Sequence, residues 1–278
     1  MMNRPFVKMN GLGNDFVVVD AGAGPFRPTP AEVRAIADRQ HGVGCDQLIA
    51  LEPSRSGHAF MRVWNADGGE VGACGNGARC AGWLVMQAAG REIIDLETAG
   101  GVLNVRDAGS ELVTVDMGAP GLGWRDIPLA RPMDTDQVDL CVQADWPAPG
   151  CVSMGNPHVV FFVLDAEAAP VRRLGPIVER HALFPERANV GFAQIVGRDR
   201  IRLRVWERGA GLTKACGTGA CAALVAAHRR DLADDTATIV MDGGELAIHW
   251  RPDDGHVLMT GPIAVEFTGR LPSTETPA

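Results

Sequence analysis

Lysine is scarce in this 278-residue sequence, which contains only Lys8 and Lys214. An enzyme that uses pyridoxal phosphate needs a lysine that forms a Schiff base with that cofactor. Neither lysine lies in a recognisable cofactor motif, so any amino-acid chemistry is expected to proceed without a cofactor. Lys214 also comes before the glycine loop beside it, the reverse of the order in G-x-x-x-x-G-K-[ST], which disfavours a nucleotide site of that type.

Several other features that the sequence lacks narrow the class of protein. No uncharged apolar run approaches the ~18–20 residues of a membrane span, and the N-terminal segment MMNRPFVKMN has no hydrophobic signal core. The net charge is −8, and clustered lysine and arginine are needed to neutralise nucleic-acid phosphates. We therefore expect a cytoplasmic protein with neither a membrane nor a nucleic-acid partner.

The cysteines are odd in number, seven in all, and none forms a C-x-x-C pair. Neither a disulfide framework nor a structural zinc site is supported, so no metal is expected. Five are expected to be small buried side chains, namely Cys45, Cys80, Cys141, Cys151 and Cys221. The other two, Cys74 and Cys216, lie in similar segments, GACGNGARC (72–80) and KACGTGACA (214–222).

These segments belong to an internal repeat. With an offset of 142 residues, RVWNADGGEVGACGNGA (62–78) aligns with RVWERGAGLTKACGTGA (204–220), and nine of the seventeen positions are identical. The offset later becomes 143, and the match extends over 13–118 and 155–261. A register held over this length indicates a duplication that produced two lobes, because a solenoid needs at least three shorter repeats.

Each half shows the same order of short β-branched runs, followed by a helix after the cysteine. The expected strands are 16–20, 59–64, 102–107, 112–117, 158–165, 200–207, 245–250 and 256–260. The helices, 76–89 and 218–231, are apolar on nearly all faces, which predicts burial. The expected fold class is α+β, with two pseudo-symmetric lobes, each a β-sheet or roll wrapped around a buried central helix, and an active site in the cleft between them.

The lobe limits are predicted from the repeat and from the composition of the segment that joins its copies. We expect the N-terminal lobe to comprise residues 1–119, completed by 262–278, and the C-terminal lobe to comprise 120–261. The connection near 119–150 is rich in proline and glycine.

In both copies Cys-Gly-x-Gly directly precedes the predicted helix. Unpaired N–H groups and the positive end of the helix dipole would stabilise a thiolate there, lowering its pKa from ~8.5 toward neutrality. The glycines would let backbone N–H groups bind a carboxylate. Two such thiols, opposed across a pseudo-twofold axis, suit inversion of a carbon stereocentre, which needs a base on one face and an acid on the other.

Four segments resemble the signature segments of the diaminopimelate epimerase family and occur in its order. They are MNGLGNDFVVVD (9–20), NADGGEVGACGNGARC (65–80), GNPHVV (155–160) and ERGAGLTKACGTGACAA (207–223). The resemblance implies a cofactor-independent enzyme that interconverts LL- and meso-diaminopimelate in lysine and peptidoglycan-precursor biosynthesis. It also implies two similar lobes with the active site between them.

The resemblance further implies roles for individual residues. Cys74 and Cys216 would be the catalytic pair, with His158 and Glu207 tuning their pKa values. The substrate would be bound by Asn14, Gln47, Asn65, Gly75, Asn76, Asn156, Asn189, Glu207, Arg208, Gly217 and Thr218. Phe267 stands near a position linked to dimerisation in relatives, which suggests a homodimer.

The residue types suit this substrate, which carries two carboxylates and two ammonium groups. Arg208 can pair a carboxylate bidentately, Glu207 can accept from an ammonium, and the amides add donors and acceptors without net charge. Asn65-Ala66 in one half aligns with Glu207-Arg208 in the other. We expect this asymmetry to orient a nearly symmetric substrate.

Two alternatives stay open at this stage. One is a related epimerase or racemase of the same architecture that acts on proline or hydroxyproline. The other is a thiol redox or ligand-binding protein whose two cysteines cycle between dithiol and disulfide. The lack of C-x-x-C and the presence of two anion-binding loops argue against the second alternative.

Overall fold

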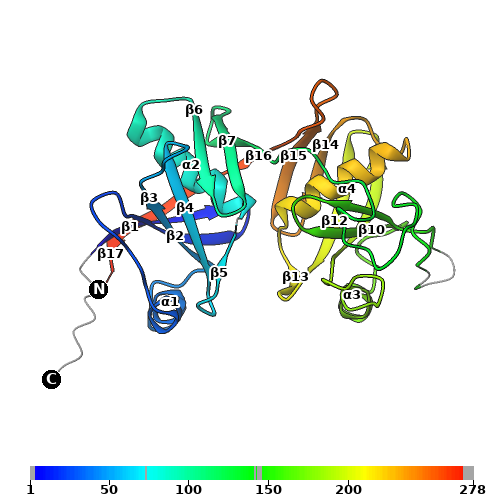
Figure 1. The fold of residues 1–278 in the computed structure, drawn as a ribbon, viewed down its shortest axis with the longest axis horizontal. Helices are drawn as coiled ribbons and strands as arrows, with labels where there is room; N and C mark the ends of the chain where they lie inside the picture. The colour runs from blue at the N-terminus through cyan, green and yellow to red at the C-terminus, as the bar shows by residue number, and fades with distance from the viewer. Residues whose placement is uncertain (1–3, 73, 141, 143–145, 272–278) are drawn as a thin grey trace. The chain divides into compact units, whose positions relative to one another are not determined.

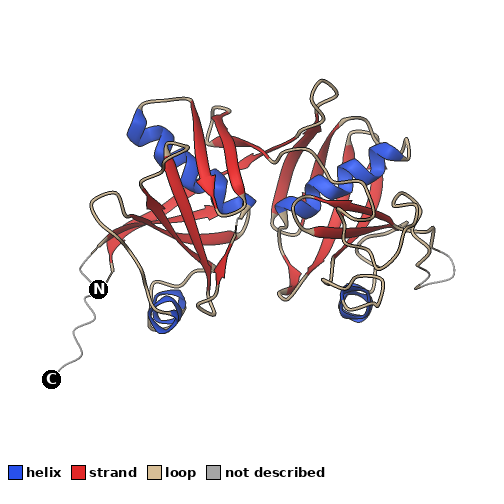
Figure 2. Ribbon diagram, viewed as in Figure 1, coloured by secondary structure: helices blue, strands red, loops and turns tan. Residues whose placement is uncertain are grey.

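A computed structural model of the chain describes residues 4–72, 74–140, 142 and 146–271. The chain divides into two compact units, which we call unit 1 (Met1–Val115 and Gly261–Ala278) and unit 2 (Asp116–Thr260). Each unit is a strand-dominated mixture of β-sheet and a few helices, so the α+β class is confirmed (Figure 2). The division expected from the sequence, at 119/120 and 261/262, lies a few residues from these limits.

The two units repeat one order of elements (Figure 1). Unit 1 contains β1 (Pro5–Gly11), β2 (Asn14–Asp20), α1 (Pro30–Ala37), β3 (Gln47–Glu52), β4 (Ala59–Asn65), β5 (Glu70–Val71), α2 (Gly75–Ala89), β6 (Ile93–Thr98), β7 (Gly101–Asp107) and β8 (Leu112–Asp116). Unit 2 contains β9 (Gly150–Ser153), β10 (Pro157–Phe162), α3 (Val171–Glu179), β11 (Asn189–Gly197), β12 (Arg200–Glu207), β13 (Gly211–Thr213), α4 (Gly217–Arg229), β14 (Thr236–Met241), β15 (Gly244–Trp250) and β16 (Val257–Pro262). The last strand, β17 (Ala264–Arg270), pairs antiparallel with β1 and so completes unit 1.

The strand registers of the two units are equivalent. In the parallel pair β2–β3, Phe16 lies opposite Gln47, and in the parallel pair β10–β11, His158 lies opposite Asn189. Each residue of the second pair is 142 positions after its counterpart in the first. In the parallel pairs β4–β6 and β12–β14, the partner of Ala59 is Leu96 and the partner of Ile201 is Ile239. Ile201 lies 142 positions after Ala59, whereas Ile239 lies 143 positions after Leu96. The offset between the units therefore changes from 142 to 143 in the structure as it does in the sequence. The repeat therefore describes hydrogen-bond register as well as sequence.

A central helix lies against several strands in each unit. Helix α2 packs on β1, β6 and β7 and also meets β2, β3 and β4, while α4 has the equivalent neighbours in unit 2. A Cβ on Gly82 would lie 2.6 Å from Cγ1 of Val105, so only glycine allows α2 to approach β7 this closely. The predicted burial is confirmed for α4, whereas the second half of α2 is buried only in part.

The strands beneath the helices are covered on both faces. In β2, Val17 and Val19 join a core that includes Val33 and Ile36 of α1. Phe16 and Val18 are also buried, and they alternate with the first pair to the opposite face of the strand. Helix α1 begins with a capping box formed by Thr29 and Glu32. The sequence did not predict α1 or α3, because eight- and nine-residue helices show too little periodicity.

Unit 2 includes the segment that the sequence assigned to a connection. Ile127, Leu129 and Val138 of this segment are buried in the core that α3 covers, so the segment is more than a linker.

Four of the five cysteines that were expected to be buried are buried in the structure. These are Cys45, Cys80, Cys151 and Cys221, for which the prediction is confirmed, and Cys141 lies outside the described residues. Within the described part of the chain, none of the helices combines the length and apolar character needed to cross a membrane.

Candidate active site

Cys74 is the residue from which α2 begins. Its backbone is extended, and its Sγ accepts a hydrogen bond from the N–H of Gly77 at 3.3 Å, so a thiol takes the capping role that Ser, Thr, Asp or Asn usually fills. A Cβ on Gly77 would lie 2.9 Å from Cδ1 of Ile49 and 3.5 Å from the Cys74 sulfur. The glycine therefore lets the first turn fit between the thiol and β3. Asn76 follows in this turn, is buried, and accepts from the buried guanidinium of Arg79 at 3.0 Å.

Cys216 occupies the same position at the start of α4 but lies deeper. It is 5% exposed, whereas Cys74 is half-buried. Its sulfur lies 3.7 Å from Oγ1 of Thr218, and a Cβ on Gly219 would come within 3.1 Å of that sulfur. The second glycine of the motif thus keeps space for the thiol itself.

The electrostatic surroundings of Cys216 differ from the expectation. Burial raises the pKa of its thiol well above the ordinary value, and the negative charge of Glu207 raises it further. The N–H of Gly219 and the hydroxyl of Thr218 act in the opposite direction and do not compensate. The predicted lowering of the thiol pKa is therefore wrong for Cys216, because burial and a neighbouring carboxylate outweigh the start of the helix.

Glu207 shares this buried environment. Burial also raises the pKa of its carboxyl, and hydrogen bonds from Thr213 and Cys216 oppose that rise. The Thr213 hydroxyl donates directly to Oε1 of Glu207. A thiol and a carboxyl that both resist ionisation, side by side, are suited to holding and passing one proton between them.

A chain of polar contacts connects the Cys216 loop with β10. The amide nitrogen of Asn156 donates to Thr218 at 3.4 Å, and the amide oxygen lies 2.9 Å from Nε2 of His158. His158 is 1% exposed, and burial, with a contribution from the charge of Arg208, lowers its pKa to about 3. The imidazole is therefore neutral, and the Nε2–H tautomer donates to Asn156.

Asn189 holds the neighbouring loop. Its amide nitrogen donates to the carbonyl of Pro157 at 3.0 Å, and its amide oxygen accepts from the backbone N–H of Arg208 at 2.9 Å. The guanidinium of Arg208 donates to the carbonyl of Glu186 at 2.9 Å. The structure thus brings together within unit 2 the residues that the sequence predicted there, namely Asn156, His158, Asn189, Glu207, Arg208, Cys216, Gly217 and Thr218.

Glu179 supports this loop and was missed by the sequence. Its side chain is buried, and its carboxylate accepts from Nε1 of Trp206 at 2.8 Å and from the N–H of Gly209 at 3.2 Å. These donors flank the Glu207-Arg208 pair on both sides. The equivalent position in unit 1 is Ala37, so comparison of the two halves did not indicate that Glu179 is important.

The predicted polar residues of unit 1 lie at the ends of neighbouring strands. Gln47 and Asn65 form a cross-strand pair, with a 2.8 Å hydrogen bond between their amides. Oε1 of Gln47 is buried and has no hydrogen-bond partner among the described residues. Asn14 donates from its amide nitrogen to Asp46 at 2.8 Å. Cys74, Gly75 and Asn76 lie together at the start of α2, which also packs on β2, β3 and β4.

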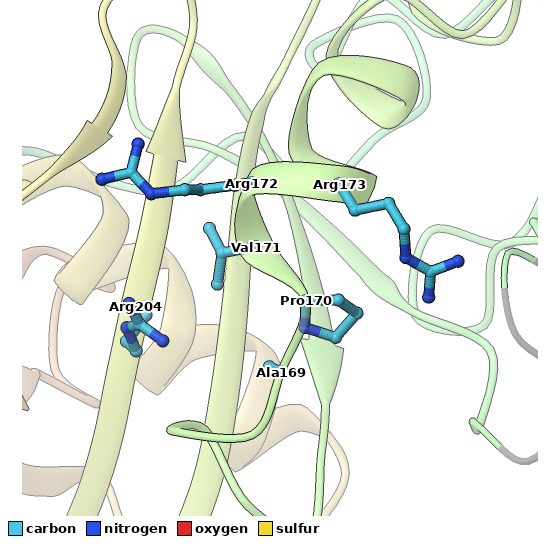
Figure 3. Close-up of a pocket in the computed structure, with 6 residues that line it drawn as sticks. All are labelled: Ala169, Pro170, Val171, Arg172, Arg173 and Arg204. Carbon is cyan, nitrogen blue, oxygen red and sulfur yellow. The ribbon is translucent and has the colours of Figure 1, made fainter.

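Two other features lie apart from these groups. Phe267 is on β17 and is 48% exposed. A pocket at the start of α3 is lined by Ala169, Pro170, Val171, Arg172, Arg173 and Arg204, which include none of the predicted site residues. The side chains of Arg172 and Arg173 point in different directions, so they do not converge on one ligand (Figure 3).

Comparisons with known proteins agree with the sequence motifs. The family model described as diaminopimelate epimerase matches residues 6–122 and 150–265. The diaminopimelate epimerase of Phenylobacterium zucineum is 64% identical over 274 residues, covering 98% of this chain and 99% of that protein.

Two solved structures share the fold at low sequence identity. A PhzF-family phenazine biosynthesis protein from Enterococcus faecalis has a TM-score of 0.72 at 12% identity, covering 98% of this chain and 100% of that one. A hydroxyproline epimerase from Agrobacterium vitis has a TM-score of 0.66 at 16% identity, covering 96% and 92%. Since the family model matches most of the sequence and the Phenylobacterium relative matches nearly all of it, the chain belongs to the diaminopimelate epimerase family.

Proposed function

We propose that the protein is a cofactor-independent epimerase that interconverts LL- and meso-diaminopimelate in lysine and peptidoglycan-precursor biosynthesis. The observation that carries the proposal is that two topologically equivalent helices each begin at the cysteine of a Cys-Gly-x-Gly motif. Membership of the family supports the choice of substrate.

In the proposed reaction, Cys74 and Cys216 act on opposite faces of one α-carbon. The thiolate of one cysteine takes the α-proton, and the electron pair of the broken C–H bond delocalises into the adjacent carboxylate. The thiol of the other cysteine then donates a proton to the opposite face, forming a new C–H bond with inverted configuration. No electrons leave the substrate, so no oxidant or reductant is required.

The helix starts supply the electrostatic part of the mechanism. The N–H groups of a first helical turn have no partner within the helix and carry partial positive charge. We assign Gly75-Asn76 and Gly217-Thr218 to binding the reacting carboxylate, whose negative charge grows as the α-proton leaves. Glu207 would tune Cys216 because its charge raises the pKa of that thiol. His158 would act through its contact with Asn156 and, beyond it, Thr218.

The rest of the substrate would be bound by charged and amide side chains. Arg208 would pair a carboxylate, and Glu207 would accept from an ammonium. Asn14, Gln47, Asn65, Asn156 and Asn189 would provide further donors and acceptors. Glu207 and Arg208 have only Asn65 and Ala66 as counterparts in unit 1, and we propose that this difference orients the substrate.

An Arg208→Ala variant tests that orientation. Loss of a charged hydrogen-bonding partner should weaken diaminopimelate binding by about ten- to a hundredfold, while proton exchange of bound substrate changes much less. Calorimetric binding and exchange at saturating substrate measure the two effects. Arg200→Ala, which removes an exposed arginine paired with Glu245, is the control. Unchanged affinity in the Arg208 variant would contradict the assignment.

Incubation with LL-diaminopimelate in deuterated water tests the function as a whole. We expect deuterium at the α-position and formation of the meso isomer without added cofactor. Replacing either cysteine by alanine should abolish both. An absence of label would overturn the proposal and favour the redox or binding alternative. Turnover of proline or hydroxyproline in place of diaminopimelate would identify the other epimerase activity.

We further propose that the enzyme works in the cytoplasm as a homodimer with β17 at the interface. Phe267 and Val265 leave 48% and 44% of their surfaces exposed on this strand, which pairs with β1 and carries a ring contact from Phe6 to Phe267. Exposed apolar side chains on a sheet edge favour pairing with a second copy. Phe267→Glu should shift the protein toward monomer in sedimentation equilibrium, and an unchanged dimer would place the interface elsewhere.

A further inference from the structure

A cluster of charged side chains in unit 1 converges on Asn14. The carboxylate of Asp46 accepts from the Asn14 amide nitrogen at 2.8 Å, from the Asp15 N–H at 3.0 Å and from Arg39 at 2.7 Å. Arg39 also binds both oxygens of Asp15, at 2.8 and 2.9 Å. The buried Lys8 donates to Asp15 at 2.8 Å.

The charges of this cluster reinforce one another. Burial by itself would raise the pKa of Asp15, but the hydrogen bonds from Arg39 and Lys8 outweigh it and hold the pKa well below its usual range. Asp15 is therefore an anion between two cations. The backbone N–H of Asp46 also donates to Asp15, at 2.9 Å, which ties the two acidic residues together.

Unit 2 has no such cluster at the equivalent positions. An offset of 142 carries Asp15, Arg39 and Asp46 onto Pro157, His181 and Ala188. Lys8 lies opposite Val17 and Cys151 lies opposite Val159, so Cys151 is the counterpart of Lys8 in the strand register. Both units nevertheless form the same strands in the same register, so the shared fold does not require these charges. The counterpart of Asn14 is Asn156, which His158 and Thr218 hold instead.

The chemistry of Asp46 determines which way the Asn14 amide faces. A carboxylate can only accept, so the Asn14 group that contacts it is the NH₂ and not the carbonyl oxygen. Among the described residues no donor contacts that carbonyl oxygen, which is left to accept from a ligand. Gln47, the residue next to Asp46, also has a buried amide oxygen with no partner among those residues. Two neutral acceptors therefore lie on neighbouring strands, and such a pair of amide oxygens fits an ammonium group, which only donates.

We propose that Asp46 is a positioning residue that fixes the Asn14 carboxamide with its oxygen toward the substrate, where it accepts a hydrogen bond from an ammonium group. The inference rests on the proposed function, because diaminopimelate supplies the ammonium. Arg39 contributes by holding the Asp46 carboxylate. Asp15 holds Arg39 and the Asp46 backbone N–H in turn, and Lys8 binds Asp15.

Asp46→Asn is the direct test. The new amide can turn its NH₂ toward Asn14, and Asn14 then rotates its own NH₂ toward the ammonium. We expect KM for diaminopimelate to rise on the order of tenfold while kcat changes little, because the contact concerns binding more than proton transfer. In an Asn14→Ala background the same substitution should have almost no further effect, since Asp46 acts through Asn14.

A spectroscopic measurement distinguishes orientation from general stability. In ¹⁵N-labelled protein, the side-chain NH₂ of Asn14 should exchange slowly with Asp46 present and faster in Asp46→Asn. Arg39→Gln, at an exposed side chain, provides a milder second variant with a smaller expected rise in KM. Asp95→Asn is the matched control, because Asp95 accepts from Asn104 in an equivalent pair on β6 and β7, and its KM should stay unchanged.

The outcomes separate this inference from the function on which it rests. Wild-type protein that fails to turn over diaminopimelate would overturn both. Wild-type turnover together with an unchanged KM in Asp46→Asn, or with effects of Asp46→Asn and Asn14→Ala that simply add, would overturn the positioning role alone. Unchanged exchange of the Asn14 amide would do the same.

Discussion

Cys74 and Cys216 occupy the same place in two equivalent units, and their surroundings differ. Each begins a central helix, and in each the second glycine of the Cys-Gly-x-Gly motif keeps the first turn uncrowded, beside Ile49 in unit 1 and beside the thiol in unit 2. Cys74 is half-buried and accepts from Gly77, whereas Cys216 is buried beside the carboxyl of Glu207. The duplication therefore preserved the geometry of the loops, while the charges around them were set separately in each unit.

The same contrast extends to the residues behind the loops. Unit 2 has His158 where unit 1 has Phe16, and Glu207 where unit 1 has Asn65. Its polar groups form one connected set around Cys216. Unit 1 instead places its charges behind Asn14, in the cluster around Asp46. One fold thus supports two different electrostatic environments.

The largest effect is expected from removing the thiols. Cys74→Ala and Cys216→Ala should each lower epimerisation by about a thousandfold or more, since each would remove one of the two proposed proton carriers. Their stabilities should differ, because only Cys216→Ala leaves a gap in a buried site. A coupled turnover assay and calorimetric melting measure the two effects. Retention of a tenth of the activity in either variant would contradict the two-cysteine mechanism.

A smaller difference should appear at the second glycine of each motif. The added methyl of Gly219→Ala would press on the Cys216 sulfur, whereas that of Gly77→Ala would first meet the flexible end of Ile49. We expect kcat to fall about tenfold in the first variant and less in the second, although alanine favours the helix by about 1 kcal/mol. Steady-state kinetics would show this, and equal losses would argue against the difference in thiol packing.

Glu207→Gln should make the Cys216 environment resemble that of unit 1. Because the carboxylate raises the pKa of the Cys216 thiol, its removal should lower that pKa. The rate of alkylation as a function of pH, measured in a Cys74→Ala background, reports the shift. Burial raises the pKa of Cys45 to about 11 and that of Cys80 to about 12, so these two thiols react slowly below those pH values.

The smallest effect concerns stability and involves His158. Its pKa is about 3 in the folded protein, against 6.5 for an unperturbed histidine, so the unfolded chain binds more protons between these values. Stability should therefore fall as the pH decreases from 6.5 toward 3, because over this range this histidine binds a proton only in the unfolded chain. His158→Phe, which copies Phe16, should flatten that part of the profile in denaturant unfolding at several pH values. A slope equal to that of wild type would assign the acid sensitivity to other groups.

Long apolar segments made much of the fold predictable from the sequence. The helices expected at 76–89 and 218–231 are α2 and α4, and the strand expected at 200–207 is β12. Each of these elements has a counterpart in the other half of the sequence, so the repeat supported each assignment a second time. The short helices α1 and α3 could not be predicted in this way, because they are too brief to show a period.

Motifs suggested the candidate site, but contacts determine how its residues behave. The positions of Cys74, Cys216 and Glu207 follow from the repeat and the resemblance, and their roles stay predictions. The raised pKa of Cys216 depends on burial and on its distance from Glu207, and neither is encoded in spacing. Asp46 and Glu179 were missed because their hydrogen-bond partners, such as Asn14 and Trp206, are distant in the sequence, and because the repeat offers no match at either position.

The pairing of β17 with β1 has a consequence for how the chain is made. These strands are the first and the last of the described chain, and they are neighbours in one sheet. The residues of unit 2 are contiguous, so they have all been synthesised before β17 emerges from the ribosome. Unit 1 cannot close its sheet until residue 270 has been translated, so we expect the second unit in the sequence to be the first to finish folding.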